Sequence, residues 1–459
     1  MKTLRRALGA LLLLSAALLM RPAIAWAHAH LKKSEPATGS TLPTPPHVIR
    51  LWFSERPDTS LTTVILSDSA GTPFATGAAS PDPDGPLALS FPIRDVLGGG
   101  LYTVMWTTAG SDGHPSKGHF TFRVTGAPAV AAPVAPPPMP QVALDTSIKA
   151  PPQDVAASAV TPAYVVARAI SFAAMLAMMG AVAFRIGVLT RVQGLSRATE
   201  VAIADRIATI SIAISAVYVL SAVLRLYLQS RMISGDFFDA EHLRTMGMNT
   251  EWGSAWRPQF GAGVVAFIGF ILVRGRGLPA WGVVGSVMMS LAAATAVSGH
   301  AWSSPRMPAL AVMVDTFHII GAAGWMGSLL WMAAAGLPVI QSSRDNRAKR
   351  AAALVQAFSP LALVFAAVVG ITGVVSAWLR LGVLDALWST SYGQVLLVKL
   401  ALLVALAAMG FHNWRRVSPS LGTDAGTARL ERSAVIEVGI GLLVVIVTAV
   451  LVATPTPLS

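Results

Sequence analysis

The sequence contains no cysteine among its 459 residues. Disulfide bonds, zinc–thiolate sites and thiol catalysis are therefore excluded. Any soft metal would have to bind histidine, methionine or carboxylate side chains, and the chain has 9 histidines and 17 methionines to supply them. Metal chemistry remains open, but only with these ligands.

Charged residues are scarce: they make up 12% of the chain, against 54% hydrophobic residues. This is too apolar for an ordinary soluble protein of such length. The apolar residues are unevenly spread, because residues 28–160 are typical of a soluble segment and residues 161–455 are dominated by long apolar runs. The composition therefore indicates a membrane protein with a soluble domain in front of it.

Motifs for nucleotide-driven work are also missing. The sequence has no G-x-x-x-x-G-K-[ST] loop and no Asp-Lys-Thr-Gly segment of the kind found in phosphorylated metal pumps. The net charge of +12 comes without a basic stripe on the soluble segment, since most arginines lie in short loops between apolar runs. Direct ATP coupling, a nucleic-acid partner and enzymatic activity are not expected.

Residues 1–27 have the three parts of a secretory signal: a basic start, the apolar run Leu8–Met20 and a small-x-small cleavage site at Ala25-Trp26-Ala27. Cleavage there would make His28 the new amino terminus. A competing site at Ala27-His28-Ala29 would expose His30 instead. In both cases we expect the soluble segment to be exported.

Residues 28–125 are predicted to form an all-β sandwich, an Ig-like or cupredoxin-like Greek key. Apolar and polar residues alternate, as in Ile49, Leu51 and Phe53 or Phe120 and Phe122, and turn-forming residues separate the strands. Residues 126–160 are rich in proline and alanine, cannot build a core and favour extended geometry. We interpret them as a tether.

Residues 161–455 are predicted to form an all-α membrane domain with eight spans. The apolar runs cover about 161–184, 207–228, 259–273, 280–299, 308–335, 355–379, 394–411 and 434–454. The odd-numbered loops between them carry fourteen Arg and Lys residues, against six in the even-numbered loops and nearby span ends. The positive-inside rule places the odd loops in the cytoplasm and both termini outside, in agreement with the signal.

Two short clusters in the soluble segment could bind a metal. A free α-amine at His28, its imidazole and an intervening backbone nitrogen can chelate one ion, and His30 adds another donor; nitrogen-rich tetragonal sites suit copper(II). Asp112 and His114 stand two apart in Ser111-Asp112-Gly113-His114-Pro115. The alternative for this second cluster is a plain turn, because Asp-Gly and His-Pro are turn formers.

The soluble segment resembles the CopC family of periplasmic copper-binding sandwiches. The resemblance is carried by HAHLKKSEPATGSTLPTPPHVIRLWFSE and GGGLYTVMWTTAGSDGHPSKGHFTFRV. It implies a mature chain starting at His28, and a copper(II) site made by the amine and imidazole of His28, Asp112 and His114. Glu55 is implied as a nearby ligand or supporting group.

The sequence departs from family members that carry a methionine-rich loop for copper(I). Met105 stands alone in residues 28–125, so a separate copper(I) site in the sandwich is not predicted. His119 lies on the same side of its strand as Thr121 and Arg123 and is interpreted as a surface residue.

Ionisable residues inside apolar runs are functional candidates, because they are costly in a bilayer. His300 ends the fourth run, and Asp315 and His318 lie three apart in the fifth, on one helix face. The alternative role for the two histidines is an interhelical hydrogen bond. Lys399 in the seventh run could snorkel, pair with an acid or line a polar cavity.

Methionines could extend a path for soft copper(I), or could simply pack in the core or against lipid. They are Met175, Met178 and Met179 in the first run, Met288 and Met289 in the fourth, Met313 in the fifth and the pair Met246 and Met248 in an outer loop.

Residues 250–415 resemble the CopD family of inner-membrane copper proteins. The carrying segments are EWGSAWRPQ, SGHAWSSP, DTFHIIGAAGWMGSLLW and SYGQVLLVKLALLVALAAMGFHNW. The resemblance implies copper uptake together with a CopC domain, and makes His300 and His318 the candidate membrane ligands, for copper(I) or copper(II). A tether would raise the effective concentration of the donor domain at the membrane.

We therefore expect copper binding in the periplasm and copper transport across a bacterial inner membrane, with copper ion and the lipid bilayer as partners and periplasmic copper chaperones as candidates. One alternative is a haem- or copper-dependent membrane redox protein, since paired histidines can ligate haem. Another is a periplasmic copper buffer or sensor that transports nothing.

Overall fold

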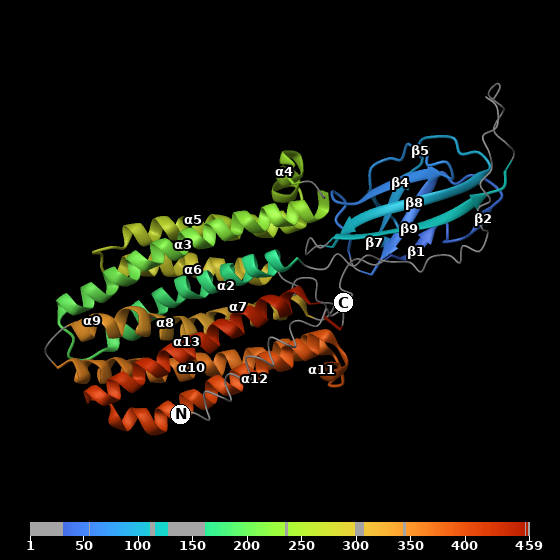
Figure 1. The fold of residues 1–459 in the computed structure, drawn as a ribbon. Helices are drawn as coiled ribbons and strands as arrows, with labels where there is room; N and C mark the ends of the chain where they lie inside the picture. Colours follow the sequence, from blue (N-terminus) through green and yellow to red (C-terminus); the bar gives the residue numbers. More distant parts are fainter. Residues whose placement is uncertain are drawn as a thin grey trace, which may run out of the picture.

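The computed structural model describes residues 31–54, 56–110, 115–126, 161–234, 237–298, 307–342, 346–454 and 456–457. A β-sandwich lies against one end of a long helical bundle (Figure 1). The predicted fold class, an all-β sandwich followed by an all-α membrane domain, is confirmed.

The sandwich has a four-stranded sheet ordered β1-β3-β7-β6 and a five-stranded sheet ordered β2-β9-β8-β4-β5. All pairings are antiparallel except β2 with β9. The strands are β1 (Leu31–Glu35), β2 (Thr41–Leu42), β3 (Val48–Phe53), β4 (Thr63–Asp68), β5 (Pro73–Phe74), β6 (Ser80–Asp82), β7 (Gly85–Pro92), β8 (Gly100–Ala109) and β9 (Pro115–Val124).

The predicted alternation fills the space between the sheets. Ile49, Leu51 and Phe53 of β3 are buried, as are Phe120 and Phe122 of β9. Because successive strand residues point to opposite faces, a single register places all of them in one core.

The bundle is built from long helices joined by short turns. They are α2 (Pro162–Ala183), η1 (Phe184–Val188), η2 (Leu189–Arg191), α3 (Arg197–Ser234), α4 (Ala240–Met248), α5 (Glu251–Leu272), α6 (Leu278–Val297), α7 (Pro308–Ala322), η3 (Ala323–Gly327), α8 (Ser328–Trp331), η4 (Met332–Gly336), α9 (Leu337–Ser342), α10 (Arg347–Leu381), α11 (Ala386–Ser389), α12 (Ser391–His412), η5 (Asn413–Val417), η6 (Ser418–Ser420) and α13 (Asp424–Ala453).

Within the described residues, eight helical segments are long and apolar enough to cross a membrane. They are Pro162–Arg191, Arg197–Ser234, Glu251–Leu272, Leu278–Val297, Pro308–Ser342, Arg347–Leu381, Ser391–Val417 and Ala425–Ala453. The predicted number of spans is thus confirmed. Most helices are longer than the apolar runs, because polar turns extend them beyond the hydrocarbon length.

Helix α2 occupies the centre of the bundle and packs on α3, α6, η3 and α13. Its Met178 and Ala181 are fully buried in the main core cluster, together with Phe184 at the start of η1. Helices α7, α10, α12 and α13 form the other side of the bundle, away from α3 and α5 (Figure 1). The polar groups described next lie on that side.

Candidate functional site

Six of the predicted metal ligands lie outside the described residues. They are His28, His30, Glu55, Asp112 and His114 of the sandwich and His300 of the membrane domain. Among the residues that the structure describes, no group of three or more histidine and carboxylate side chains is arranged to hold a metal. The described residues that flank these ligands in the chain indicate where the ligands of the sandwich enter the fold.

The described neighbours of these ligands come together at one end of the sandwich. Leu31, which follows the predicted amino-terminal ligands, pairs with Phe53, two residues before Glu55. Pro57, two residues after Glu55, forms a β-bridge with Gly110, where the chain enters the loop holding Asp112 and His114. Three chain segments that carry predicted ligands thus start from the same end of the fold.

A packed frame supports this end. The Phe53 and Trp106 rings meet edge to face with centroids 5.5 Å apart. Strand β8 pairs with β9 as far as Ala109 and Pro115, the last residues on each side of the ligand loop. Two well-packed strands therefore hold the loop at both ends.

At the far side of sheet β1-β3-β7-β6, Asp82 anchors the edge strand. Ser90 donates a short hydrogen bond to its carboxylate, and Arg50 Nε lies 3.3 Å from Oδ2. The Ser90 hydroxyl is the main cause that lowers the pKa of Asp82, helped by the Asp84 amide and Arg50 and opposed by burial. This group stabilises the sheet and is not part of the predicted copper site.

The isolated candidates of the sandwich are on its surface. Met105 is half exposed, and no second methionine accompanies it in the described strands. His119 is exposed, as the alternation predicted.

In the membrane domain, Asp315 of α7 is bound by α10. Ser376 Oγ donates to Asp315 Oδ1 at 3.0 Å, and Arg380 forms a close ion pair with Oδ2. Both carboxylate oxygens are therefore engaged. Asp315 fixes the packing of α7 against α10 and is not free to bind a cation.

His318 contacts the same helix one turn deeper. Its Nδ1 lies 3.0 Å from Thr372 Oγ1, and that hydroxyl donates its hydrogen to Val368 O at 2.6 Å. Nδ1 must therefore be the donor, so the neutral ring carries its lone pair on Nε2. A carbonyl or hydroxyl partner of this kind orients metal-binding histidines in proteins.

Lys399 of α12 completes the cluster. It lies near enough to Arg380, Asp315 and His318 to influence their charges, and no hydrogen bond or ion pair joins it to another described residue. Tyr392 at the start of α12 approaches the Arg380 guanidinium. An acid partner for Lys399 is therefore not found among the described residues, and snorkelling and the lining of a polar cavity stay predictions.

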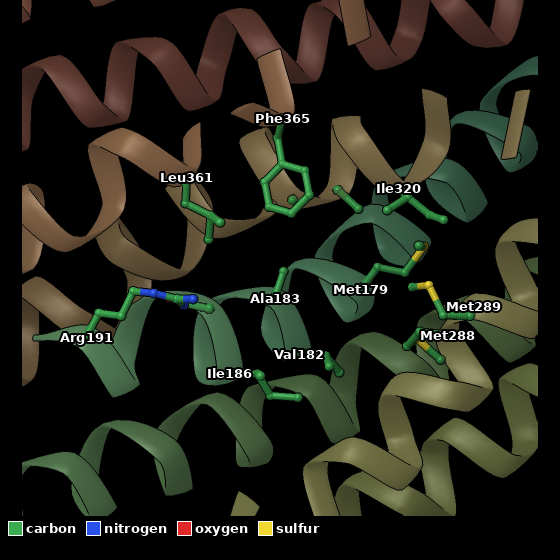
Figure 2. Close-up of a pocket in the computed structure, with 13 residues that line it drawn as sticks. Met179, Val182, Ala183, Ile186, Arg191, Met288, Met289, Ile320, Leu361 and Phe365 are labelled. Carbon is green, nitrogen blue, oxygen red and sulfur yellow. The ribbon is translucent and has the colours of Figure 1, made fainter. Parts of the chain in front are cut away.

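Three of the candidate methionines lie close together, and the others lie elsewhere. Met179, Met288 and Met289 line a cavity of about 340 Å³ between α2, α6, α7 and α10, with their sulfur atoms gathered at one end (Figure 2). Met175 accepts a hydrogen bond from Thr295. Met246 is buried and Met248 is exposed, so this pair is split between two environments.

Two features of the membrane domain were missed in the sequence. Arg380 was counted among the charges of the even-numbered loops and nearby span ends, although it reaches into the bundle to Asp315. Glu437 of α13 binds the Asn413 amide, and Ser433 donates to Asn413 Oδ1 at 2.7 Å. An acid inside an apolar run was the signal that could have identified Glu437.

Family models match three parts of the chain. They are the CopC domain over residues 31–125, the Copper resistance protein D-like N-terminal domain over residues 157–305 and Copper resistance protein D over residues 352–451.

Individual proteins match as well. Copper transport protein CutJ of Bacillus subtilis (strain 168) is 24% identical over 449 residues, covering 96% of this chain and 76% of CutJ. Protein YobA of Escherichia coli (strain K12) is 35% identical over 106 residues, 23% of this chain and 85% of YobA.

The sandwich resembles solved structures. The methionine-rich copper resistance protein PcoC of Escherichia coli is 31% identical, with a TM-score of 0.20, covering 22% of this chain and all of PcoC. CopC of Methylosinus trichosporium OB3b is 22% identical, with a TM-score of 0.21, covering 23% of this chain and all of that protein.

Proposed function

The chain belongs to the CopC and CopD copper-resistance families, with a CopC domain joined to a CopD membrane domain, and from this premise we propose that it captures copper(II) in the periplasm and passes copper across the inner membrane. It is a multi-pass copper-handling protein. The proposal covers the oxidation state of the bound copper, the copper site in the membrane domain and the transport step.

The observation that carries the proposal is the meeting of three chain segments at one end of the sandwich. The pairs Leu31–Phe53 and Pro57–Gly110 bring the neighbours of His28, Glu55, Asp112 and His114 to one place. An amine, two imidazoles and a carboxylate offer the nitrogen-rich, tetragonal donor set that copper(II) prefers. Copper is the cargo of this site.

In the membrane domain, Nε2 of His318 would be the first ligand to bind copper released by the sandwich. Thr372 orients the ring, and the Asp315–Arg380 pair fixes the helices on either side. The thioethers of Met179, Met288 and Met289 suit copper(I), because soft sulfur ligands select it. Copper(II) released by the sandwich would need one electron from a cellular reductant such as a thiol before it could bind there. The name of the relative CutJ as a copper transport protein supports passage through this domain.

The first test is copper(II) binding by the purified full chain. We expect His28→Ala to weaken binding by about a hundredfold in a competition titration, because the substitution removes an imidazole ligand from the chelate, and loss of even a supporting partner costs about 10–100-fold. His119→Ala is the matched control, since it removes a histidine from the exposed face of β9. Equal affinities for the two variants would contradict the sandwich site.

The second test is copper accumulation by cells that express the chain or carry His318→Ala. Transport would be supported if cells that express the natural chain accumulate more copper than the deletion strain, and if His318→Ala abolishes this excess. A Soret band in the purified protein would favour the redox alternative, and copper binding without any change in accumulation would favour the buffer.

A further inference from the structure

The sandwich and the bundle share a small apolar cluster that belongs to the core of neither. Leu61 and Ala109 of the sandwich pack with Ile233 of α3, Met246 of α4 and Trp252 of α5, and all five are buried. Figure 1 shows the sandwich seated at this end of α3, α4 and α5. The two domains therefore meet through a defined surface.

One hydrogen bond crosses this surface at the start of α5. The first amide groups of a helix have no partner within the helix and need a capping acceptor. Thr250, which directly precedes α5, caps one of them, with its hydroxyl oxygen accepting from Gly253 N at 2.9 Å. Asp58 of the sandwich caps another, with Oδ2 accepting from Glu251 N at 3.0 Å. The helix is thus capped jointly by the two domains.

Asp58 is well placed to act between domains. Its other oxygen, Oδ1, accepts from Ser60 N at 3.0 Å and from Ser60 Oγ at 2.5 Å, both within the sandwich. Its backbone carbonyl accepts from Thr62 Oγ1 at 2.6 Å. The side chain is buried and anionic, and it faces the positive end of the α5 dipole. One carboxylate oxygen serves each domain, so the docked sandwich meets α5 in one defined orientation.

The rest of the surface is incompletely closed. Arg56 lies 3.5 Å from Glu251, but both side chains are largely exposed and such a pair contributes little. A cavity of about 240 Å³ lies between the domains, with Thr59 and Pro86 on one side and Asn249 on the other. A surface of this kind favours reversible docking, which a tether can support because it keeps the sandwich at a high effective concentration.

The surface borders the proposed copper site. Arg56 follows Glu55 directly, and Ala109 and Gly110 immediately precede the loop with Asp112 and His114. We propose that Asp58 is a positioning residue that docks the sandwich on the start of α5, so that its copper end faces the membrane domain during delivery. This inference rests on the proposed function, because it specifies how the same site meets its acceptor.

The experiment uses the absence of cysteine in the natural chain. Thr59→Cys and Asn249→Cys introduce one thiol on each wall of the interdomain cavity, and a short bismaleimide then measures docking of the full chain in membranes. Thr59→Cys with Ser389→Cys, on α11, is the control pair. We expect efficient crosslinking of the first pair alone.

Adding Asp58→Ala should lower the docked-to-undocked ratio about fivefold, the change that corresponds to loss of one helix cap. Asp68→Ala is the matched control, because Asp68 Oδ1 accepts from Ala70 N and Thr72 N within its own turn, outside the interdomain cluster and cavity. Trp252→Ala changes only the bundle side of the surface and should lower crosslinking as well.

Copper(II) affinity of the full chain separates this inference from the proposed function. Asp58→Ala is expected to bind copper(II) with the same affinity as the natural chain. It should, however, need a higher copper concentration for half-maximal uptake. The docking role would be overturned if both Asp58→Ala and Trp252→Ala crosslinked as efficiently as the chain without these substitutions. Absence of copper binding in the natural chain would instead overturn the proposed function, whatever the crosslinking shows.

Discussion

At the scale of single residues, Asp82 joins β6 to β7, because Ser90 of β7 donates a hydrogen bond to its carboxylate. Its pKa lies below the ordinary value of 3.8, first because Ser90 donates to the carboxylate. A lowered folded-state pKa means that the charged form contributes stability above pH 3.8, and that this contribution is lost as the pH falls through the folded-state value.

We therefore predict that the hydrogen-exchange protection factors of β6 and β7 in the full chain, which correct for the pH dependence of intrinsic amide exchange, stay constant at neutral pH and fall below about pH 4. Asp82→Asn should destabilise the sandwich at neutral pH by about 1–3 kcal/mol and flatten the acid dependence. Ser90→Ala should move the acid midpoint upward, since it removes the largest cause of the shift. An unchanged midpoint in Ser90→Ala would refute this account.

At the scale of elements, the number of spans was predictable and their ends were not. The third apolar run was expected at 259–273, but α5 begins at Glu251. Polar residues and Pro258 conceal its first turns from a hydropathy pattern. The start depends on caps from Thr250 and from Asp58, and the second lies 193 residues earlier in the chain. Tertiary contacts of this range cannot be deduced from local sequence.

Helix contacts in the bundle depend on a crossing of two glycines. A β-carbon on Gly180 of α2 would lie 2.4 Å from Gly327 Cα in η3, so the backbones touch where α2 passes this segment. Small residues permit such close approach in membranes. Any side chain at this point would force the helices apart.

We predict that Gly180→Ala lowers the unfolding free energy of the membrane domain by about 1–3 kcal/mol, because overpacking displaces both helices. Unfolding in a series of SDS–detergent mixtures would measure it. Gly370→Ala in α10 is the matched control: no atom lies within 4 Å of its added β-carbon, so helix propensity should stabilise it by up to about 1 kcal/mol. Equal stabilities of the two variants would show that the crossing tolerates bulk.

At the scale of the whole molecule, composition predicted the order of soluble and membrane parts, since apolar runs begin where the bundle begins. It did not predict how the two parts meet. The surface that joins them uses Leu61, Ala109 and Trp252, whose sequence contexts are those of ordinary core residues. The metal ligands of the sandwich were suggested by local motifs and family resemblance, and they remain predictions.

The basic residues at the two ends of the molecule predict its orientation. Fourteen basic residues were assigned to the cytoplasmic side and six to the outer side. Arg185 lies 3.0 Å from Glu200 and Arg380 is paired with Asp315, but the positive-inside rule counts Arg and Lys residues and is not a net-charge rule. The bias of fourteen to six therefore favours a cytoplasmic end opposite the sandwich.

We predict that a membrane-impermeant maleimide labels Ser389→Cys, at the sandwich end, in cells whose inner membrane is intact. Gln193→Cys, in the turn between η2 and α3, should react only after the membrane is opened. The natural chain has no cysteine, so it supplies a blank for both. The reverse pattern would place the sandwich on the cytoplasmic side. Copper capture outside the cell membrane would then be physically impossible for this chain.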